Sequence, residues 1–230
     1  MGAAVFRVRE GQQVVTQYNP IVKNPNTVGQ QTQRAKFKLM SQLAAVMSPG
    51  FGTMSVTTRK AKGKPSQRNA FSQLNFPLVE VTSEDETVTA KIPMEQVKLT
   101  SSFRDLPAMT ISGASEEIEA EIENLSPDIA TVRFILVGYT NNVPSIITMR
   151  DQPKGHSTGV VFTQAVPVGK YTLLAYGLIP SESAKASIDL DNIHTPEDED
   201  FISAVELNAM VAEGSLVETK TVGANVSVTA

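Results

Sequence analysis

The spacing of hydrophobic residues predicts one clear helix in a chain that is otherwise rich in strand-like segments. In residues 29–47 the apolar positions recur every three or four residues, and they are Phe37, Met40, Leu43, Ala44, Val46 and Met47. This period is that of an amphipathic helix. Thr27 with Gln30 has the spacing of a capping box, and Ser48-Pro49-Gly50 is a typical stop.

The segments on either side of this helix are predicted from turn residues and short apolar runs. Residues 3–9 and 13–18 flank Glu10-Gly11-Gln12, which indicates a β-hairpin. An isolated hairpin is marginal in water, so we expect it to join a sheet of its own body or of a neighbour. Residues 19–31 form an extended arm because its prolines fix φ. Residues 50–68 form a loop, and a short helical turn follows near residues 66–74.

From residue 76 onward the pattern changes to alternation with β-branched residues, which predicts strands. The predicted strands are 77–82, 87–92, 96–101, 117–123, 129–139, 144–150, 157–166, 170–178, 184–190, 201–211 and 219–229. Turn signals separate them, among them Asn141-Asn142, and short strands at this spacing favour an antiparallel sandwich. The predicted fold is therefore mainly β: an N-terminal hairpin, an extended arm and one helix, followed by one or two Ig-like β-sandwiches.

The charge distribution divides the chain into two parts. Residues 1–75 contain 11 lysines and arginines and one acid, Glu10, for a charge of +10, while residues 76–230 carry −14. Such asymmetry suggests a partner of defined charge. We therefore predict a basic hairpin, arm and helix module at 1–75 and an acidic sandwich region at 76–230, with a possible split near residues 110–125.

Composition narrows the classes of function. The chain has no cysteine, which excludes thiol nucleophiles and cysteine zinc sites, and its start lacks the long apolar core of a signal peptide. We expect a soluble protein made in the cytoplasm. No phosphate-binding loop, HExxH or GxSxG motif occurs, so neither an enzyme nor a cofactor is expected.

Three candidate chemical sites have simpler explanations. His156 and His194 lie in polar turn contexts, which indicates exposed loop histidines. The acidic segment 189–200 could hold a hard cation such as calcium, but it lacks the EF-hand pattern, and a solvated loop is the default. A strand with one solvent-exposed acidic face is predicted by the alternating glutamates, which are Glu116, Glu117, Glu119, Glu121 and Glu123.

The basic loop 59–68, with Arg34, Lys36 and Lys38, could contact nucleic acid. No aromatic residues interleave with its cations, among which are Arg59, Lys60, Lys62 and Lys64. A protein with an acidic surface would suit these cations at least as well as nucleic acid, and this chain itself carries an acidic region at 76–230. In a head-to-tail oligomer the basic part of one subunit would face the acidic part of the next, an arrangement that can close as a ring.

The N-terminal segment also carries a family-like motif. Its residues are Tyr18, Asn19, Pro20, Asn24, Pro25, Thr27, Gln30, Gln33 and Arg34, preceded by Val5-Phe6-Arg7-Val8-Arg9-Glu10-Gly11-Gln12. The pattern resembles uncharacterised proteins of Bacteroidales and of their crAss-like phages. The resemblance covers roughly the first 75 residues well and the remainder in general character, and the loop 59–68 departs from it. It implies a virion component of the neck or tail, with these residues as shared interface positions and no catalytic motif.

The sequence therefore predicts a structural virion protein, assembled in the bacterial host cytoplasm as a subunit of a multimeric ring. Its expected partners are copies of itself and other virion proteins, with nucleic acid possible and no membrane. The alternative is a non-enzymatic binding module, either a nucleic-acid-contacting accessory protein or an adhesin-like sandwich.

Overall fold

The computed structural model describes most of the chain. The described residues are 4–9, 12–17, 27–52, 66–84, 87–154, 157–180 and 216–229. The predicted strands at 184–190 and 201–211 lie outside them, as do the arm residues 18–26 and the basic loop at 53–65. For β1 (Ala4–Arg9) and β2 (Gln12–Gln17) only the backbone is described.

The helical elements are close to those expected from the sequence. They are α1 (Val28–Met47), α2 (Gln67–Asn75) and the 3-10 turns η1 (Ser48–Gly50), η2 (Phe76–Leu78) and η3 (Met94–Gln96). Thr27 is the N-cap of α1, and its side-chain oxygen accepts a hydrogen bond from the backbone nitrogen of Gln30 at 3.4 Å. Ser66 caps α2 in the same way. The predicted helix and its capping residue are confirmed.

The strands after residue 79 are antiparallel. They are β3 (Glu80–Glu84), β4 (Thr87–Lys91), β5 (Met109–Ala114), β6 (Glu117–Ile122), β7 (Thr131–Thr140), β8 (Val143–Pro153), β9 (Val160–Ala165), β10 (Gly169–Pro180), β11 (Leu216–Glu218) and β12 (Val222–Val228). The sheet β5-β6-β9 faces a larger sheet in which β11 and β12 both pair with β10, followed by β7 and β8. This is the predicted Ig-like sandwich.

The described residues form one sandwich. Positions 110–125, where a division into two was considered, contribute its β5–β6 hairpin. A tyrosine corner marks the start of β10, because the Tyr171 hydroxyl donates to the carbonyl oxygen of Pro167 at 2.8 Å. The Asn141-Asn142 turn joins β7 to β8 with positive φ at both residues, which asparagine tolerates well.

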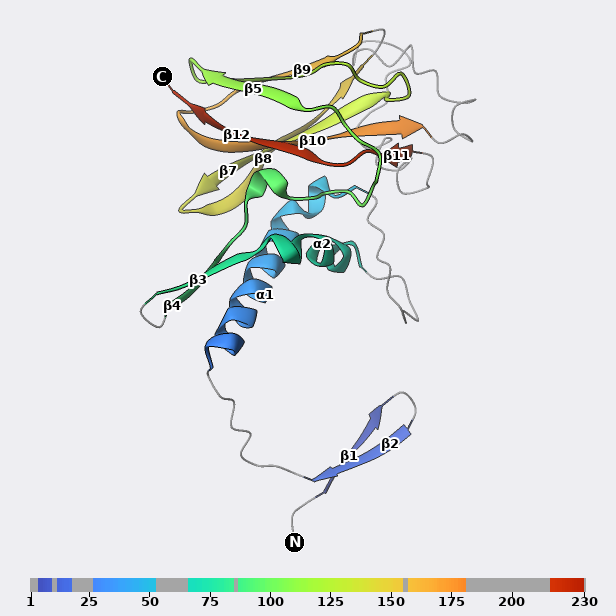
Figure 1. Cartoon of the computed structure of the whole chain (residues 1–230), viewed down its shortest axis with the longest axis vertical. Helices are drawn as coiled ribbons and strands as arrows, with labels where there is room; N and C mark the ends of the chain where they lie inside the picture. The colour runs from blue at the N-terminus through green and yellow to red at the C-terminus, as the bar shows by residue number, and fades with distance from the viewer. Residues whose placement is uncertain are drawn as a thin grey trace.

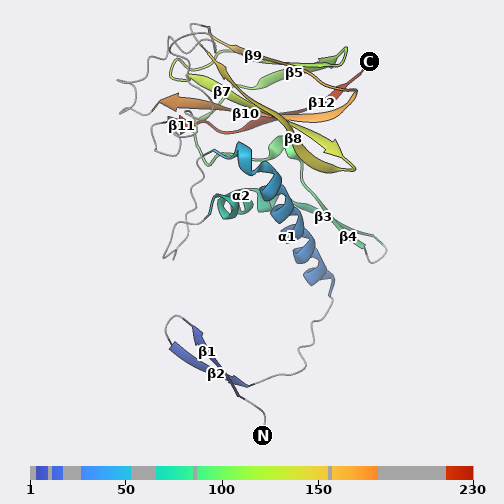
Figure 2. The same cartoon turned by 180° about the vertical axis from the view of Figure 1, so that it is seen from behind.

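Three layers stack in the body of the molecule. The sheet β5-β6-β9 lies at one end, the sheet containing β7 and β10 lies in the middle, and α1, α2 and β3–β4 form a helical layer beyond it (Figures 1 and 2). The middle sheet is therefore covered on both faces. This explains why Phe134–Val137 and Leu173–Ile179 are continuous apolar runs instead of alternating ones.

Residues of β7 and β10 alternate between two hydrophobic cores. Phe134, Leu136 and Leu173 face β6 and β9 in the intersheet core. Ile135 and Leu174 face α1 and α2 in the helix core. The helix core combines residues from both sides of position 75, namely Met40, Leu43, Met47 and Phe71 with Val79, Val137, Tyr176 and Leu178. The described parts of the two predicted regions, 1–75 and 76–230, therefore share one core.

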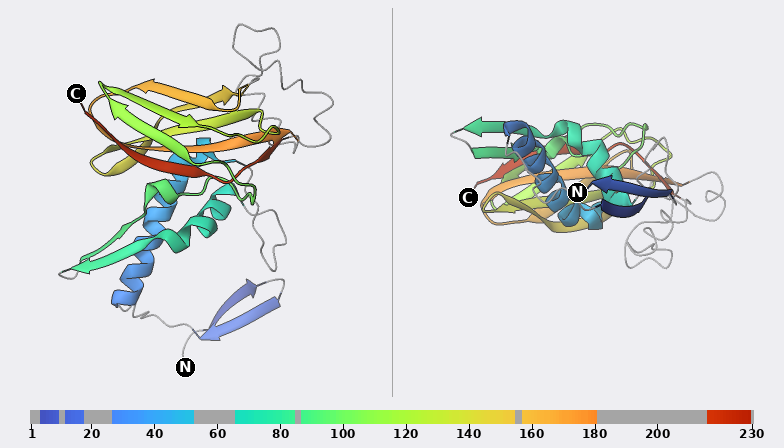
Figure 3. Two further views of the ribbon diagram at one scale, coloured as in Figure 1. Left: turned by 45° about the horizontal axis from the view of Figure 1, so that its top comes forward. Right: turned by 90° about the horizontal axis from the view of Figure 1, so that it is seen from below.

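The β1–β2 hairpin is confirmed, with Phe6 opposite Val15 and Val8 opposite Gln13. Among the described strands, β1 and β2 pair only with each other. Figure 3 (left) shows the hairpin below α1, away from the sandwich.

Among the described residues, one predicted strand does not form, and one observed strand was not predicted. Residues 96–101 form no strand, because side chains take the backbone groups that a neighbouring strand would take. The buried Asn75 accepts from the backbone nitrogen of Lys98 at 2.7 Å and donates to its carbonyl oxygen at 2.9 Å, and Thr221 Oγ1 accepts from the nitrogen of Leu99. The strand β5 was missed, since Met109–Ala114 contains few strongly apolar residues.

Candidate functional site

The structure describes four of the predicted interface residues. Thr27, Gln33 and Arg34 are exposed on the first turns of α1, and Gln30 is half-buried, with no hydrogen-bond partner for its side-chain oxygen among the described residues. The remaining nine lie outside the described residues, and they are Tyr18, Asn19, Pro20, Asn24, Pro25, Arg59, Lys60, Lys62 and Lys64. The part of the predicted surface that can be located is therefore the exposed beginning of α1.

A groove between α1 and α2 lies beside these residues. Phe37, which the sequence pattern placed on the buried face of α1, is 64% exposed. Its ring lies 5.2 Å from the ring of Phe76, measured between centroids. The two aromatic rings line a groove of about 440 Å³, which is completed by Asn69, Ser72, Gln73 and Pro77. We refer to it as the helix groove.

Two cations, Lys36 and Arg68, lie beside the helix groove. Lys38 on α1 and Arg68 on α2 are exposed, and Arg68 lines an adjoining hollow together with Phe37 and Met40. The ammonium of Lys36 lies 5.6 Å from the centroid of the Phe76 ring, within the range of a cation–π contact. The groove thus combines an apolar floor with a positively charged rim.

The opposite end of the body is acidic. Glu117, Glu119 and Glu121 are exposed on the outer face of β6, while the intervening Ile118, Ala120 and Ile122 are buried in the intersheet core. The predicted strand with one acidic face is confirmed. The register places small residues beside the glutamates on β5 and β9, which are Thr110, Ser112, Ala114, Thr163 and Ala165, together with Val161. We call this surface the acidic face.

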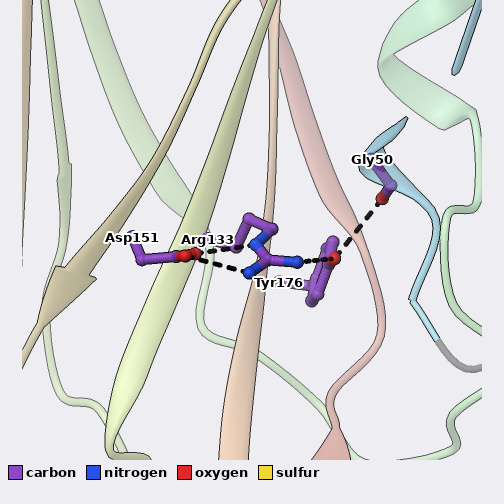
Figure 4. Close-up of polar contacts among 4 residues, drawn as sticks. All are labelled: Gly50, Arg133, Asp151 and Tyr176. Carbon is purple, nitrogen blue, oxygen red and sulfur yellow. Dashed lines mark hydrogen bonds and ion pairs between the residues drawn. The ribbon is translucent and has the colours of Figure 1, made fainter. Parts of the chain in front are cut away.

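A buried polar network joins the middle sheet to the end of α1 (Figure 4). Arg133 on β7 is 1% exposed, and its guanidinium donates to both carboxylate oxygens of Asp151 on β8, at 2.7 and 2.9 Å. Arg133 also donates to the hydroxyl of Tyr176 on β10 at 3.3 Å, and that hydroxyl donates to the carbonyl oxygen of Gly50 at 3.3 Å. Because Gly50 closes η1, the network fixes the end of α1 against the sheet.

Burial and charge shift the pKa values within this network. Burial alone would lower the pKa of Arg133, but the hydrogen bonds and charges of Asp151 and Tyr176 raise it above its ordinary value. Burial raises the pKa of Tyr176 to about 12, against the opposing effect of Arg133. Both groups therefore keep their neutral-pH protonation states, and their role is to hold the fold together.

Sequence reasoning did not single out this network. The available signal was Arg133 itself, a lone cation within a strand whose neighbours are apolar on both sides. Such a residue in a strand buried on both faces requires a buried partner. Asp151 and Tyr176 are distant in sequence, and only the pairing of β7 with β8 and β10 brings them together.

A second hollow, of about 590 Å³, lies between α1, β4 and the β7–β8 turn. Tyr139 lines it and belongs to a chain of side-chain hydrogen bonds through Thr172 and Asn225 to Glu95, with distances of 2.6, 2.6 and 2.8 Å. Burial raises the pKa of Tyr139. These hydrogen bonds link β7, β10, β12 and η3, so they stabilise one end of the middle sheet.

In the described part of the chain, no group of three or more Asp, Glu or His residues is placed to hold a metal ion, and no helix is long and apolar enough to cross a membrane. His156, His194 and the acidic segment 189–200 lie outside the described residues.

Comparisons with known proteins identify no family. No family model matches the chain, and no curated protein matches it. Among solved structures, the chain is similar to domains d3–d4 of the rat CD45 extracellular region. The sequence identity is 12%, the match covers 76% of this chain and 85% of that chain, and the TM-score is 0.22. A similarity of this size carries no argument, and the fold assignment rests on the strand order.

Proposed function

We propose that this protein is a structural, non-catalytic subunit of a multimeric ring in the neck or tail of a phage particle. Its partners are copies of itself and other virion proteins. The viral setting comes from the resemblance of the first 75 residues, described above, to proteins of Bacteroidales and their crAss-like phages.

The observation that carries the assembly role is the β1–β2 hairpin. Its strands pair only with each other among the described strands. A two-stranded hairpin is marginal in water and gains stability by adding to a third strand or another surface. Its edges suit strand addition to a neighbouring subunit, which is a common mode of protein recognition. The hairpin and the arm that follows it would then link one subunit to the next.

The experiment is light scattering over a range of protein concentrations, with the full chain and with a variant lacking residues 1–25. This truncation keeps Thr27, the N-cap of α1. We expect the average mass of the full chain to rise with concentration, and the truncated protein to need at least tenfold more protein for the same rise. Equal masses for both proteins at every concentration would contradict the role of the hairpin and arm.

Nucleic acid binding is the second candidate function, because Lys38 and Arg68 are exposed and the sequence carries four further cations at residues 59–64. A binder of this kind neutralises phosphates, so its affinity for DNA falls steeply as salt rises. Titration of labelled duplex and single-stranded DNA at two salt concentrations separates the two candidates. Assembly of the protein without DNA favours the ring subunit.

A further inference from the structure

We propose that the helix groove of one chain binds the acidic face of a second copy of this chain. The proposal rests on the proposed function, because it specifies the surfaces through which the subunits associate. It is independent of the β1–β2 hairpin, which would supply a separate contact.

The helix groove has the composition of a protein-binding surface. Phe37 stays 64% exposed although it lies against Phe76, so a large aromatic side chain is presented to solvent at the edge of the helix core. Aromatic anchors beside a pocket dominate the binding energy of many interfaces, with charged residues at the rim. Here Lys36 and Arg68 lie beside the groove, and the exposed Lys38 follows Phe37 along α1, so the groove favours a partner that is negatively charged.

The acidic face matches this groove in charge. Glu117, Glu119 and Glu121 are exposed on β6, whereas Lys36 and Arg68 lie beside the groove. The carboxylates of one chain can therefore face the cations of another.

The neighbours of the glutamates allow close approach of another chain. The register places Ser112 and Thr163 on either side of Glu119, and both side chains are short. Val161, which is paired with Glu121, is 48% exposed and offers an apolar contact for the ring of Phe37. The side chains beside the glutamates are thus short, and Val161 gives the acidic face an apolar contact residue at one end.

One chain cannot form this contact with itself. The acidic face is the outer surface of the sheet β5-β6-β9, and the helix groove lies in the helical layer, with the middle sheet between them (Figure 1). The contact must therefore join two chains through different surfaces, which is a heterologous contact. Repetition of a heterologous contact closes into a ring when the rotation between subunits permits it.

The test uses charge reversal in the full chain. One variant carries Lys38→Glu and Arg68→Glu at the groove, and a second carries Glu119→Lys and Glu121→Lys on the acidic face. All four residues are exposed. A control with two charge reversals but no change in net charge carries Lys170→Glu and Asp128→Lys, which are exposed residues outside both surfaces. Circular dichroism verifies that each variant is folded, and sedimentation velocity measures association.

We expect each reversed variant alone to associate at least 30-fold more weakly than the natural chain, because like charges face each other across the contact. An equimolar mixture of the two variants regains association, since every groove then meets a face of opposite charge. A Phe37→Ala variant, which leaves all charges in place, also weakens association at least tenfold. The Lys170→Glu/Asp128→Lys control associates like the natural chain.

Reversed variants that associate as strongly as the natural chain would overturn the proposal, and the ring function would then depend on other surfaces such as the hairpin. Unchanged association of Phe37→Ala would overturn the groove as the binding surface. A natural chain that does not associate at all would instead contradict the proposed function itself, so the two failures are distinguishable.

Discussion

At the scale of single residues, the buried network of Arg133, Asp151 and Tyr176 is the feature with the clearest energetic consequence. A buried ion pair does not by itself stabilise a fold strongly, because both charges lose their hydration. Removing one partner is costly, however, since the other charge is left buried and uncompensated. The network ties Gly50, at the end of α1, to β10, so its loss also loosens the attachment of the helix.

Asp151→Asn tests this directly. Arg133 is 1% exposed and would keep its charge without a carboxylate, so we expect a loss of about 3–5 kcal/mol in the free energy of unfolding, measured by urea denaturation. The control is Asp105→Asn, which breaks the exposed Lys220–Asp105 pair and should cost no more than about 1 kcal/mol. Similar losses for both variants would contradict the assigned role of the buried pair.

The pKa of Tyr176 predicts a specific alkaline instability. The pKa of Tyr176 in the folded protein, about 12, lies above the ordinary value of 10. The contribution of its protonated hydroxyl to the free energy of unfolding is therefore fully present below pH 10 and is lost as pH rises toward 12. In that window the unfolding free energy should fall by about 1.4 kcal/mol per pH unit on account of this group. Urea denaturation of Tyr176→Phe between pH 9 and 11 should show a shallower decline than the natural chain. Equal slopes would exclude this contribution.

At the scale of elements, the close approach of η3 to β12 can be tested by adding one methyl group. A Cβ at Gly223 would collide with the carbonyl oxygen of Glu95 and would lie 2.6 Å from Leu174 Cδ2. We expect Gly223→Ala to destabilise the fold by about 1–3 kcal/mol in thermal or urea unfolding. Gly29→Ala is the matched control, because the space around Gly29 in α1 is open, and it should be neutral or stabilising. A neutral Gly223→Ala would show that β12 and η3 are less closely packed.

Most elements were predictable from the sequence because their signals are local. The helix α1 follows from apolar spacing and from Thr27, and the outer face of β6 follows from strict alternation of glutamates with apolar residues. The apolar runs in β7 and β10 indicated burial, yet only the third layer of helices explains burial on both faces. The segment 97–100 could not be predicted, since Asn75 and Thr221 hold its backbone from distant positions.

The candidate surfaces were predictable only in part, for the same reason. The charge asymmetry and the glutamates of β6 can be recognised in the sequence, so a basic part and an acidic part were expected. The exposure of Phe37 was not, because its spacing matches the buried positions of α1. The buried residues of α1 are Met40, Leu43, Ala44 and Met47, all in its second half, and Leu39 and Val46 pack partly buried against the same core.

At the scale of the whole molecule, the three layers separate opposite charges. The acidic face lies on the outer sheet, the cations of α1 and α2 lie in the helical layer, and the middle sheet stands between them (Figure 2). Complementary charges on opposite ends favour oriented, head-to-tail association of identical chains, and this attraction weakens as salt screens it. This polarity is the physical basis of the proposed ring.

The most direct measurement of the central claim is the molar mass of the natural full chain in solution, measured by light scattering at low and high salt over a range of concentrations. We predict a mass several times that of one 24.8 kDa chain at low salt, which falls as the salt concentration is raised. A mass of one chain at every concentration and at both salt levels would contradict self-assembly.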